Sequence, residues 1–257
     1  MSSARPVNED APLLDVRGLW KRFGGVVATA GVDLQLRAGE LHALIGPNGA
    51  GKTTLVSQLA GQLASDRGRV VFAGEDITRL VAHERARRGL VRSFQITRLF
   101  NSFDVLGNVA LALQATSGRG ALSPWQAVAR DRDAAERARA LLADLGLAER
   151  ASARIEALSH GEQRALEVAL ALAGAPRLVL LDEPMAGLGP DESRRMEALI
   201  GRVRERATLL LIEHDVEAVF RLADRVSVLV AGQVIASGAP AEVRREARVV
   251  DAYLGKD

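Results

Sequence analysis

Residues 46–53 have the types and spacing of a phosphate-binding loop. They fit the pattern G-x-x-x-x-G-K-[ST], follow the apolar run LHALI and precede the helix-like run TLVSQLAG. Glycines allow the backbone to curl around a polyphosphate, so that N–H groups and a helix N-terminus point at its oxygens. We expect a nucleotide to contact the loop residues Gly46, Pro47, Asn48, Gly49, Ala50, Gly51, Lys52, Thr53 and Thr54.

The end of this loop supplies the charged and hydroxyl groups. The Lys52 ammonium is expected against the β- and γ-phosphates, the Thr53 hydroxyl on Mg²⁺, and Thr54 on a phosphate. An ordinary glycine-rich turn is the alternative, and the flanking strand and helix patterns argue against it. The chain contains no Asn-Lys-x-Asp motif for reading guanine, so we expect ATP rather than GTP.

Two carboxylates follow a second apolar run. Asp182 and Glu183 come directly after LVLL at 178–181, so both emerge at the carboxyl edge of a parallel sheet, beside the loop. Asp182 can hold Mg²⁺ through water, and Glu183 can polarise the water that attacks the γ-phosphate. Two acids before Pro184 also fit a plain helix start, so alone they are weak evidence of catalysis.

The elements that position these groups predict an α/β core. Strand-like segments lie at 32–36, 41–45, 70–72, 178–181, 209–212, 226–230 and 234–236. The first and last pairs suggest antiparallel hairpins, and the purely apolar runs at 43–45, 178–181 and 209–212 suggest buried parallel strands. Helical patterns occupy 105–115 and 125–145, the latter starting after Ser123 and Pro124, with a loop at 116–123 between them.

Composition excludes several classes of protein. The 257 residues include no cysteine, which suits a reducing compartment, and 48% are hydrophobic, which suffices for a core. The start of the chain lacks the features of a secretory signal, and the most apolar stretch, at 165–175, is too short to cross a bilayer. A net charge of +2 with only 4% aromatics argues against a nucleic-acid surface, although the pI is about 9.5.

The order of three motifs resembles the ABC ATPase family. Between the phosphate loop and the Asp182-Glu183 pair stands LSHGEQ at 158–163, which we call the signature segment. The resemblance covers about residues 13–254. It implies a P-loop NTPase (RecA-like) core with an antiparallel β-subdomain and an inserted α-helical subdomain. We expect a loose tail at 1–12, a single domain at 13–257 with its core at about 13–95 and 175–240, a helical subdomain at about 96–174, and a C-terminal helix at about 240–257.

The same resemblance implies roles for further residues. Ser159 and Gly161, with Glu162 beside them, would open a helix whose N-terminus faces the γ-phosphate of ATP on the opposite subunit. Ser159 and Glu162 also have the spacing of a capping box, which is compatible with that role. Gln95 would contact Mg²⁺ and water, and His214 would hydrogen-bond the γ-phosphate as a switch histidine. The remaining histidines, His42 in its strand among them, are expected to be structural.

Other aromatic positions have two open interpretations. Phe23 resembles the aromatic residue that stacks on adenine, and it could also pack in a small cluster. Phe100 and Phe103 could offer apolar groups to a membrane partner, and core packing is the alternative for both.

The motifs depart from the family pattern at three positions. His160 stands where glycine is usual and Glu162 where glutamine is usual, and a carboxylate near a triphosphate repels it unless it is paired or turned away. Gly189 stands where the family commonly has aspartate in the loop after Glu183. Nucleotide affinity and signalling between subunits are therefore open.

Details of the sequence resemble the branched-chain amino-acid importer ATPases. These details are FGG at 23–25, RSFQ at 92–95, RLF at 98–100, AGL at 186–188, EHD at 213–215 and DAYLG at 251–255. The resemblance implies a peripheral position on the cytoplasmic face of the inner membrane and two transmembrane permease subunits. It also implies a substrate-binding protein and a second ATPase subunit, because one chain carries only one loop and one signature segment. ATP would close the pair and hydrolysis would open it.

Three alternative functions remain. The nearest is the ATPase of a lipopolysaccharide-type exporter, which shares these motifs and this length. A soluble ABC ATPase that acts on nucleic acid or ribosomes typically carries coiled-coil inserts or paired domains, which this chain lacks. A small-molecule P-loop kinase would not explain the signature segment or His214.

Overall fold

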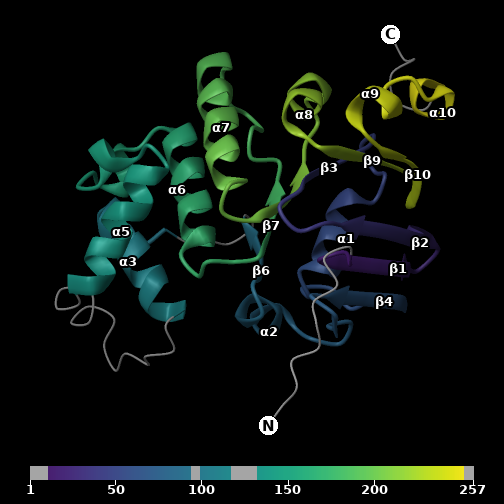
Figure 1. Ribbon diagram of the computed structural model, residues 1–257, viewed down its shortest axis with the longest axis horizontal. Coiled ribbons are helices and arrows are strands. Elements are labelled where there is room, and N and C mark those ends of the chain that lie inside the picture. Colours follow the sequence, from purple (N-terminus) through teal and green to yellow (C-terminus); the bar gives the residue numbers. More distant parts are fainter. Residues whose placement is uncertain (1–10, 94–98, 117–131, 252–257) are drawn as a thin grey trace.

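Two β-sheets and the helices around them form the structure (Figure 1). The computed structural model describes residues 11–93, 99–116 and 132–251. Gln95, Ser123, Pro124 and most of the expected tail and loop therefore lie outside the described residues. Within the described ranges, no helix combines the length and apolar character needed to cross a bilayer.

The smaller sheet is antiparallel, with the strand order β2-β1-β4-β5. Its strands are β1 (Leu14–Phe23), β2 (Val26–Leu36), β4 (Arg67–Phe72) and β5 (Glu75–Asp76). The predicted hairpin between 32–36 and 41–45 is wrong, because β2 pairs with β1. β1 has no counterpart among the predicted strands, since Gly18 has φ +56° and the register shifts beside it, which breaks the alternation of apolar residues.

The larger sheet has the order β10-β9-β3-β8-β7-β6 in the part of the chain that the structure describes. Its strands are β3 (Leu41–Ile45), β6 (Leu90–Ser93), β7 (Leu178–Asp182), β8 (Thr208–Ile212), β9 (Arg225–Val230) and β10 (Gln233–Gly238). β3, β7 and β8 are parallel neighbours and almost wholly buried, which confirms the prediction from their apolar runs. β9 and β10 form the predicted antiparallel hairpin.

The two faces of the larger sheet carry different helices. Leu178 and Leu180 point into a core that holds Leu55 of α1 (Lys52–Leu59) and the small sheet. Val179 and Leu181 point into the opposite core, which holds Leu166 of α6 (His160–Leu172). Because side chains alternate along a strand, α1 and α6 lie on opposite faces of the sheet, and Figure 1 shows them well apart.

The helical region lies on the α6 side of the sheet (Figure 1). It contains α3 (Val105–Thr116), as predicted at 105–115, α5 (Arg132–Asp144), and the short turns η1 (Ala148–Arg150) and η2 (Ile155–Ala157). α5 lies within the helix predicted at 125–145. The remaining helices between strands are α2 (Ala82–Arg87), α7 (Pro190–Val203) and α8 (Val216–Leu222).

The C-terminal region differs from the single helix predicted at about 240–257. Between residue 240 and the last described residue, 251, the structure has two short helices, α9 (Pro240–Val243) and α10 (Ala247–Val249). Val243 and Val249 are both buried in the core over β9. Six residues correspond to about 240° around a continuous helix, so one helix could not turn both valines to the same face.

Candidate functional site

The phosphate loop connects β3 to α1, and two of its glycines pack against neighbouring backbone too closely for a side chain. A Cβ on Gly46 would lie 2.0 Å from the Leu229 carbonyl oxygen, and one on Gly51 would lie 2.1 Å from the Ala28 carbonyl oxygen. Gly51 also has φ +103°, which side chains disfavour. These contacts press the loop against β2 and β9, while Asn48 and Gly49 face the solvent. The loop therefore presents its open side to a ligand.

Lys52 is held within the loop. Its Nζ donates to the carbonyl oxygens of Gly46 at 2.7 Å and Pro47 at 3.1 Å, and the residue is buried. Burial lowers the pKa of Lys52, and the nearby charges of Glu183 and Asp182 oppose that shift. Thr53 and Thr54 follow in the first turn of α1, with Thr53 exposed. The loop thus places one positive charge beside the two predicted carboxylates.

Asp182 forms a buried ion pair that its motif does not predict. Its Oδ2 accepts from Nη2 of Arg92 on β6, and the two side chains are only 11% and 2% exposed. Arg92 also donates from Nη1 to the Ser57 hydroxyl at 3.1 Å and to Gln62. The position beside Asp182 therefore accepts a cation. In the sequence, Arg92 is marked only by its place in RSFQ at 92–95, which assigns it no role.

The donor set beside the loop fits Mg²⁺. The Thr53 hydroxyl and the Asp182 carboxylate are hard oxygen ligands, which Mg²⁺ prefers. No three His, Cys, Asp or Glu side chains gather as a cage within the described ranges. That is consistent with an ion that binds through one or two protein groups together with substrate phosphates.

Glu183 and His214 meet at the carboxyl ends of β7 and β8. Glu183 Oε1 lies 2.6 Å from His214 Nε2, and the side chains are 36% and 41% exposed. Glu183 has φ +51°, and its N–H donates to the Ile212 carbonyl oxygen at 2.8 Å. This left-handed conformation is costly for a non-glycine residue, and the tie to β8 maintains it. The structure thus brings two predicted site residues into direct contact.

Glu213 is a functional candidate that motif reasoning did not identify. Its buried carboxylate accepts from the backbone N–H of Met185 at 2.7 Å and of His214 at 3.0 Å. Burial raises the pKa of Glu213, and these two donors oppose the shift. Glu213 therefore joins the loop after β7 to the loop after β8. In the sequence, Glu213 is marked by its place in EHD at 213–215, which by itself assigns it no role.

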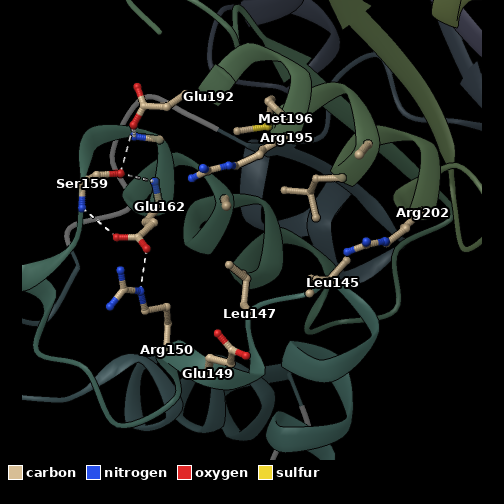
Figure 2. Close-up of a pocket in the computed structure, with 15 residues that line it drawn as sticks. Leu145, Leu147, Glu149, Arg150, Ser159, Glu162, Glu192, Arg195, Met196 and Arg202 are labelled. Atoms are coloured by element: carbon tan, nitrogen blue, oxygen red, sulfur yellow. Dashed lines mark hydrogen bonds and ion pairs between the residues drawn. The ribbon is translucent and has the colours of Figure 1, made fainter. Parts of the chain in front are cut away.

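The signature segment begins α6, as predicted. Ser159 is the N-cap: its hydroxyl accepts from the Glu162 N–H at 3.2 Å, and the Glu162 carboxylate accepts from the Ser159 N–H at 2.9 Å. The capping box is confirmed. Glu162 also pairs with Arg150 Nε at 2.5 Å, so the unusual carboxylate of this segment is neutralised (Figure 2). Gly161 lies against Glu192 of α7, with 3.3 Å from its N to Glu192 Oε1.

The remaining predicted residues are dispersed. Phe23 ends β1 and is 50% exposed, and the Lys21 ammonium lies 5.6 Å from the centroid of its ring. This exposure agrees with the predicted stacking role. Gln95 lies outside the described residues. His42 is buried between Glu40 and Ser227, with Nδ1 2.6 Å from Glu40 Oε1, which confirms a structural histidine.

Family comparisons cover most of the chain. Residues 29–186 match the model of the ABC transporter family, and residues 233–257 match a model described as a branched-chain amino acid ATP-binding cassette transporter. The second match falls on β10, α9, α10 and the end of the chain. A family-wide motif set and a narrower C-terminal feature are thus present together.

Whole-length relatives carry related names. The chain is 39% identical to the high-affinity branched-chain amino acid transport ATP-binding protein BraF of Pseudomonas aeruginosa, over 95% of this chain and 98% of that protein. It is 38% identical to LivG of Escherichia coli over the same shares. It is 35% identical to the lipopolysaccharide export system ATP-binding protein LptB of Acidithiobacillus ferridurans, over 95% of this chain and 97% of that protein.

Solved structures have the same fold. A nucleotide-free ATP-binding cassette from an ABC transporter superposes with a TM-score of 0.82 at 28% identity, covering 95% of this chain and 100% of that one. An ADP conformation of an ATP-binding cassette has a TM-score of 0.82 at 29% identity. The mixed α/β fold with a phosphate loop is confirmed.

Proposed function

The chain belongs to the ABC transporter family as an ATP-binding, ATP-hydrolysing subunit, and from this premise we propose that it energises the import of branched-chain amino acids or related small polar solutes. The observation that carries the proposal is the match of residues 233–257 to the branched-chain model, beyond the motifs shared by all family members. Identity of 39% to BraF over nearly the whole chain supports it. The transported solute is inferred from relatives, because in this proposal the ATPase site does not contact the solute.

We assign the phosphate chemistry to residues at the carboxyl edge of the large sheet and adenine binding to Phe23 of the small sheet. Lys52 and the loop N–H groups bind the phosphates, and Phe23 stacks on the adenine ring. Thr53, Asp182 and Gln95 are the proposed Mg²⁺ ligands, and the ion neutralises charge on the phosphates when it is bound. Glu183 orients and deprotonates the attacking water, while His214, at 2.6 Å, holds the Glu183 carboxylate in place.

A second ATPase subunit is part of the proposal. α1 and α6 lie on opposite faces of the sheet, so the phosphate loop and the signature segment of one chain are not adjacent. A second copy or a related subunit would supply Ser159, Gly161 and Glu162 to the nucleotide on the first. The capping box already orders these donors at the start of α6.

Permease subunits are the proposed membrane partners. Phe100 is 51% exposed, and its ring contacts Phe103 edge-on at 6.2 Å between centroids. Buried Asn108 holds the backbone of Phe100 through both its N–H and its carbonyl oxygen. A fixed, exposed aromatic ring suits docking to a permease. The proposal also includes a peripheral position on the cytoplasmic face of the membrane and an indirect link to a substrate-binding protein, both by analogy with the importer ATPases that the chain resembles.

Lipopolysaccharide export is the second candidate, favoured by the 35% identity to LptB. Uptake of radiolabelled leucine and of urea in cells lacking the gene separates the candidates. Loss of leucine uptake, restored by the wild-type gene and not by Glu183→Gln, is expected. Normal uptake of both solutes together with a defective outer membrane would instead support export.

A further inference from the structure

Glu192, in the first turn of α7, covers the N-terminus of α6 (Figure 2). Its Oε1 accepts from the Ser159 hydroxyl at 3.0 Å and from the Gly161 N–H at 3.3 Å. A Cβ on Gly161 would lie 2.9 Å from the same oxygen, so a side chain at this position would displace the Glu192 carboxylate. One carboxylate oxygen therefore engages the side-chain and backbone donors of the signature segment together.

The contact is that of an anion in a donor site. The Ser159 hydroxyl, followed by the N–H groups of Gly161 and Gly189, lowers the pKa of Glu192, so the side chain is ionised at neutral pH. A carboxylate at a helix N-terminus is favoured for the same reason as a phosphate oxygen. Glu192 thus uses the dipole of α6 as a nucleotide phosphate would.

The donors cannot serve two anions at full strength. A serine hydroxyl has one proton to donate, and a backbone amide has one N–H. While Glu192 accepts both, a γ-phosphate from another subunit can make only shared, weakened bonds to Ser159 and Gly161. Two negative charges at one helix N-terminus also repel each other.

A cavity of about 600 Å³ beside this contact gives the carboxylate an alternative position. Arg195, one turn further along α7, lines the cavity and points toward its signature end in Figure 2. Residues three apart on a helix are neighbours, so Glu192 can rotate from Ser159 to an ion pair with Arg195. We expect a change of the Glu192 rotamer to make this exchange.

We propose that Glu192 is a positioning residue that competes with the γ-phosphate of ATP for Ser159 and Gly161, so that closure of the ATPase pair requires its carboxylate to withdraw. This inference rests on the proposed role of the signature segment. Glu192 sits three residues after Gly189, in the helix that follows the loop at 185–189. Withdrawal therefore links the signature segment of one subunit to the loop at 185–189 of the same subunit.

ATP-driven dimerisation tests the competition directly. In chains that carry Glu183→Gln to block hydrolysis, light scattering gives the Mg-ATP concentration for half-maximal dimer. Adding Glu192→Ala is expected to lower that concentration about tenfold, as expected for removing one charge-assisted competitor. Asp191→Asn is the matched control: it removes one charge from the same turn, but its side chain is 76% exposed and pairs with Arg194. An unchanged or raised midpoint with Glu192→Ala, or an equal drop with Asp191→Asn, overturns the proposal.

Inorganic phosphate provides a test that does not need a dimer. The amide resonance of Gly161 in ¹⁵N-labelled protein should respond to phosphate at about tenfold lower concentration in Glu192→Ala than in wild type. Equal responses overturn the competition. Failure of every variant to dimerise on ATP, with the phosphate responses still separated, contradicts the proposed ATP-driven self-association and leaves the competition supported.

Discussion

Replacing Asp182 is expected to destabilise the fold as well as to impair catalysis. The Arg92 guanidinium is 2% exposed and has Asp182 as its carboxylate partner, with the neutral oxygens of Ser57 and Gln62 as its other acceptors. Arg92 Nε is buried without a partner among the described residues, so no spare acceptor is at hand. Asp182→Ala therefore leaves a buried charge unpaired, which typically costs about 3–5 kcal/mol.

Urea unfolding without nucleotide or Mg²⁺ measures this cost. For a chain of this size, 3–5 kcal/mol corresponds to a fall in Tm of roughly 6–20 °C. Glu183→Gln is the control, because its side chain is 36% exposed and the change should cost less than about 1 kcal/mol.

A double variant separates the ion pair from general damage. Arg92→Met with Asp182→Leu removes both charges and should recover most of the loss, since apolar replacements of a buried pair are often neutral. The reasoning is refuted if Asp182→Ala unfolds within 1 kcal/mol of wild type. It is also refuted if the double variant is no more stable than Asp182→Ala.

Three further predictions concern the loop, the aromatic ring and the buried glutamate. Gly51→Ala should abolish binding of a fluorescent ATP analogue, because its Cβ would lie 2.1 Å from the Ala28 carbonyl oxygen. Gly49→Ala carries a similar backbone strain, at φ +79°, but meets nothing within 4 Å, so it isolates the steric part and should lose less binding than Gly51→Ala. Phe23→Ala should weaken ATP binding by about 1–3 kcal/mol with an unchanged Tm, whereas Phe23→Tyr should bind ATP as wild type does. If titration calorimetry gives Phe23→Ala and wild type the same affinity for ATP, stacking is excluded. Burial raises the pKa of Glu213 above its ordinary value, so its contribution to stability is present in acid and is lost as pH rises through the raised pKa. The unfolding free energy of wild type minus that of Glu213→Gln should therefore fall as pH rises. A difference that does not change with pH would contradict this prediction.

The sequence predicts groups whose chemistry is local. The phosphate loop, the capping box of α6 and the buried parallel strands depend on residues within one turn or one strand, so their patterns survive in the linear order. The pattern of β1 is not visible in the linear order, because its alternation of apolar residues is broken at Gly18 and its partner strand, β2, begins only after the turn at Gly24. Which strands pair with each other within a sheet therefore becomes clear only from the structure.

The residues that link the motifs leave no such pattern. Arg92 reaches Asp182 across 90 positions, Glu192 reaches Ser159 across 33, and Glu213 reaches Met185 across 28. Each is a charged side chain in a sequence that is 26% charged, so its type alone gives no signal. Only tertiary packing distinguishes these residues from a solvated surface charge.

The link through Glu213 determines how the loop at 185–189 can act on the proposed base. The Glu183 N–H is tied to the Ile212 carbonyl oxygen of β8, and Glu213, just after β8, is tied back to Met185. The loop after β7 and the loop after β8 are thus each bonded to the other. A shift of the loop at 185–189 would therefore pull on the backbone that carries His214. Because Glu183 and His214 touch at 2.6 Å, such a shift reaches both as one unit. We therefore expect any displacement of this loop to change the position of the proposed base and its partner together.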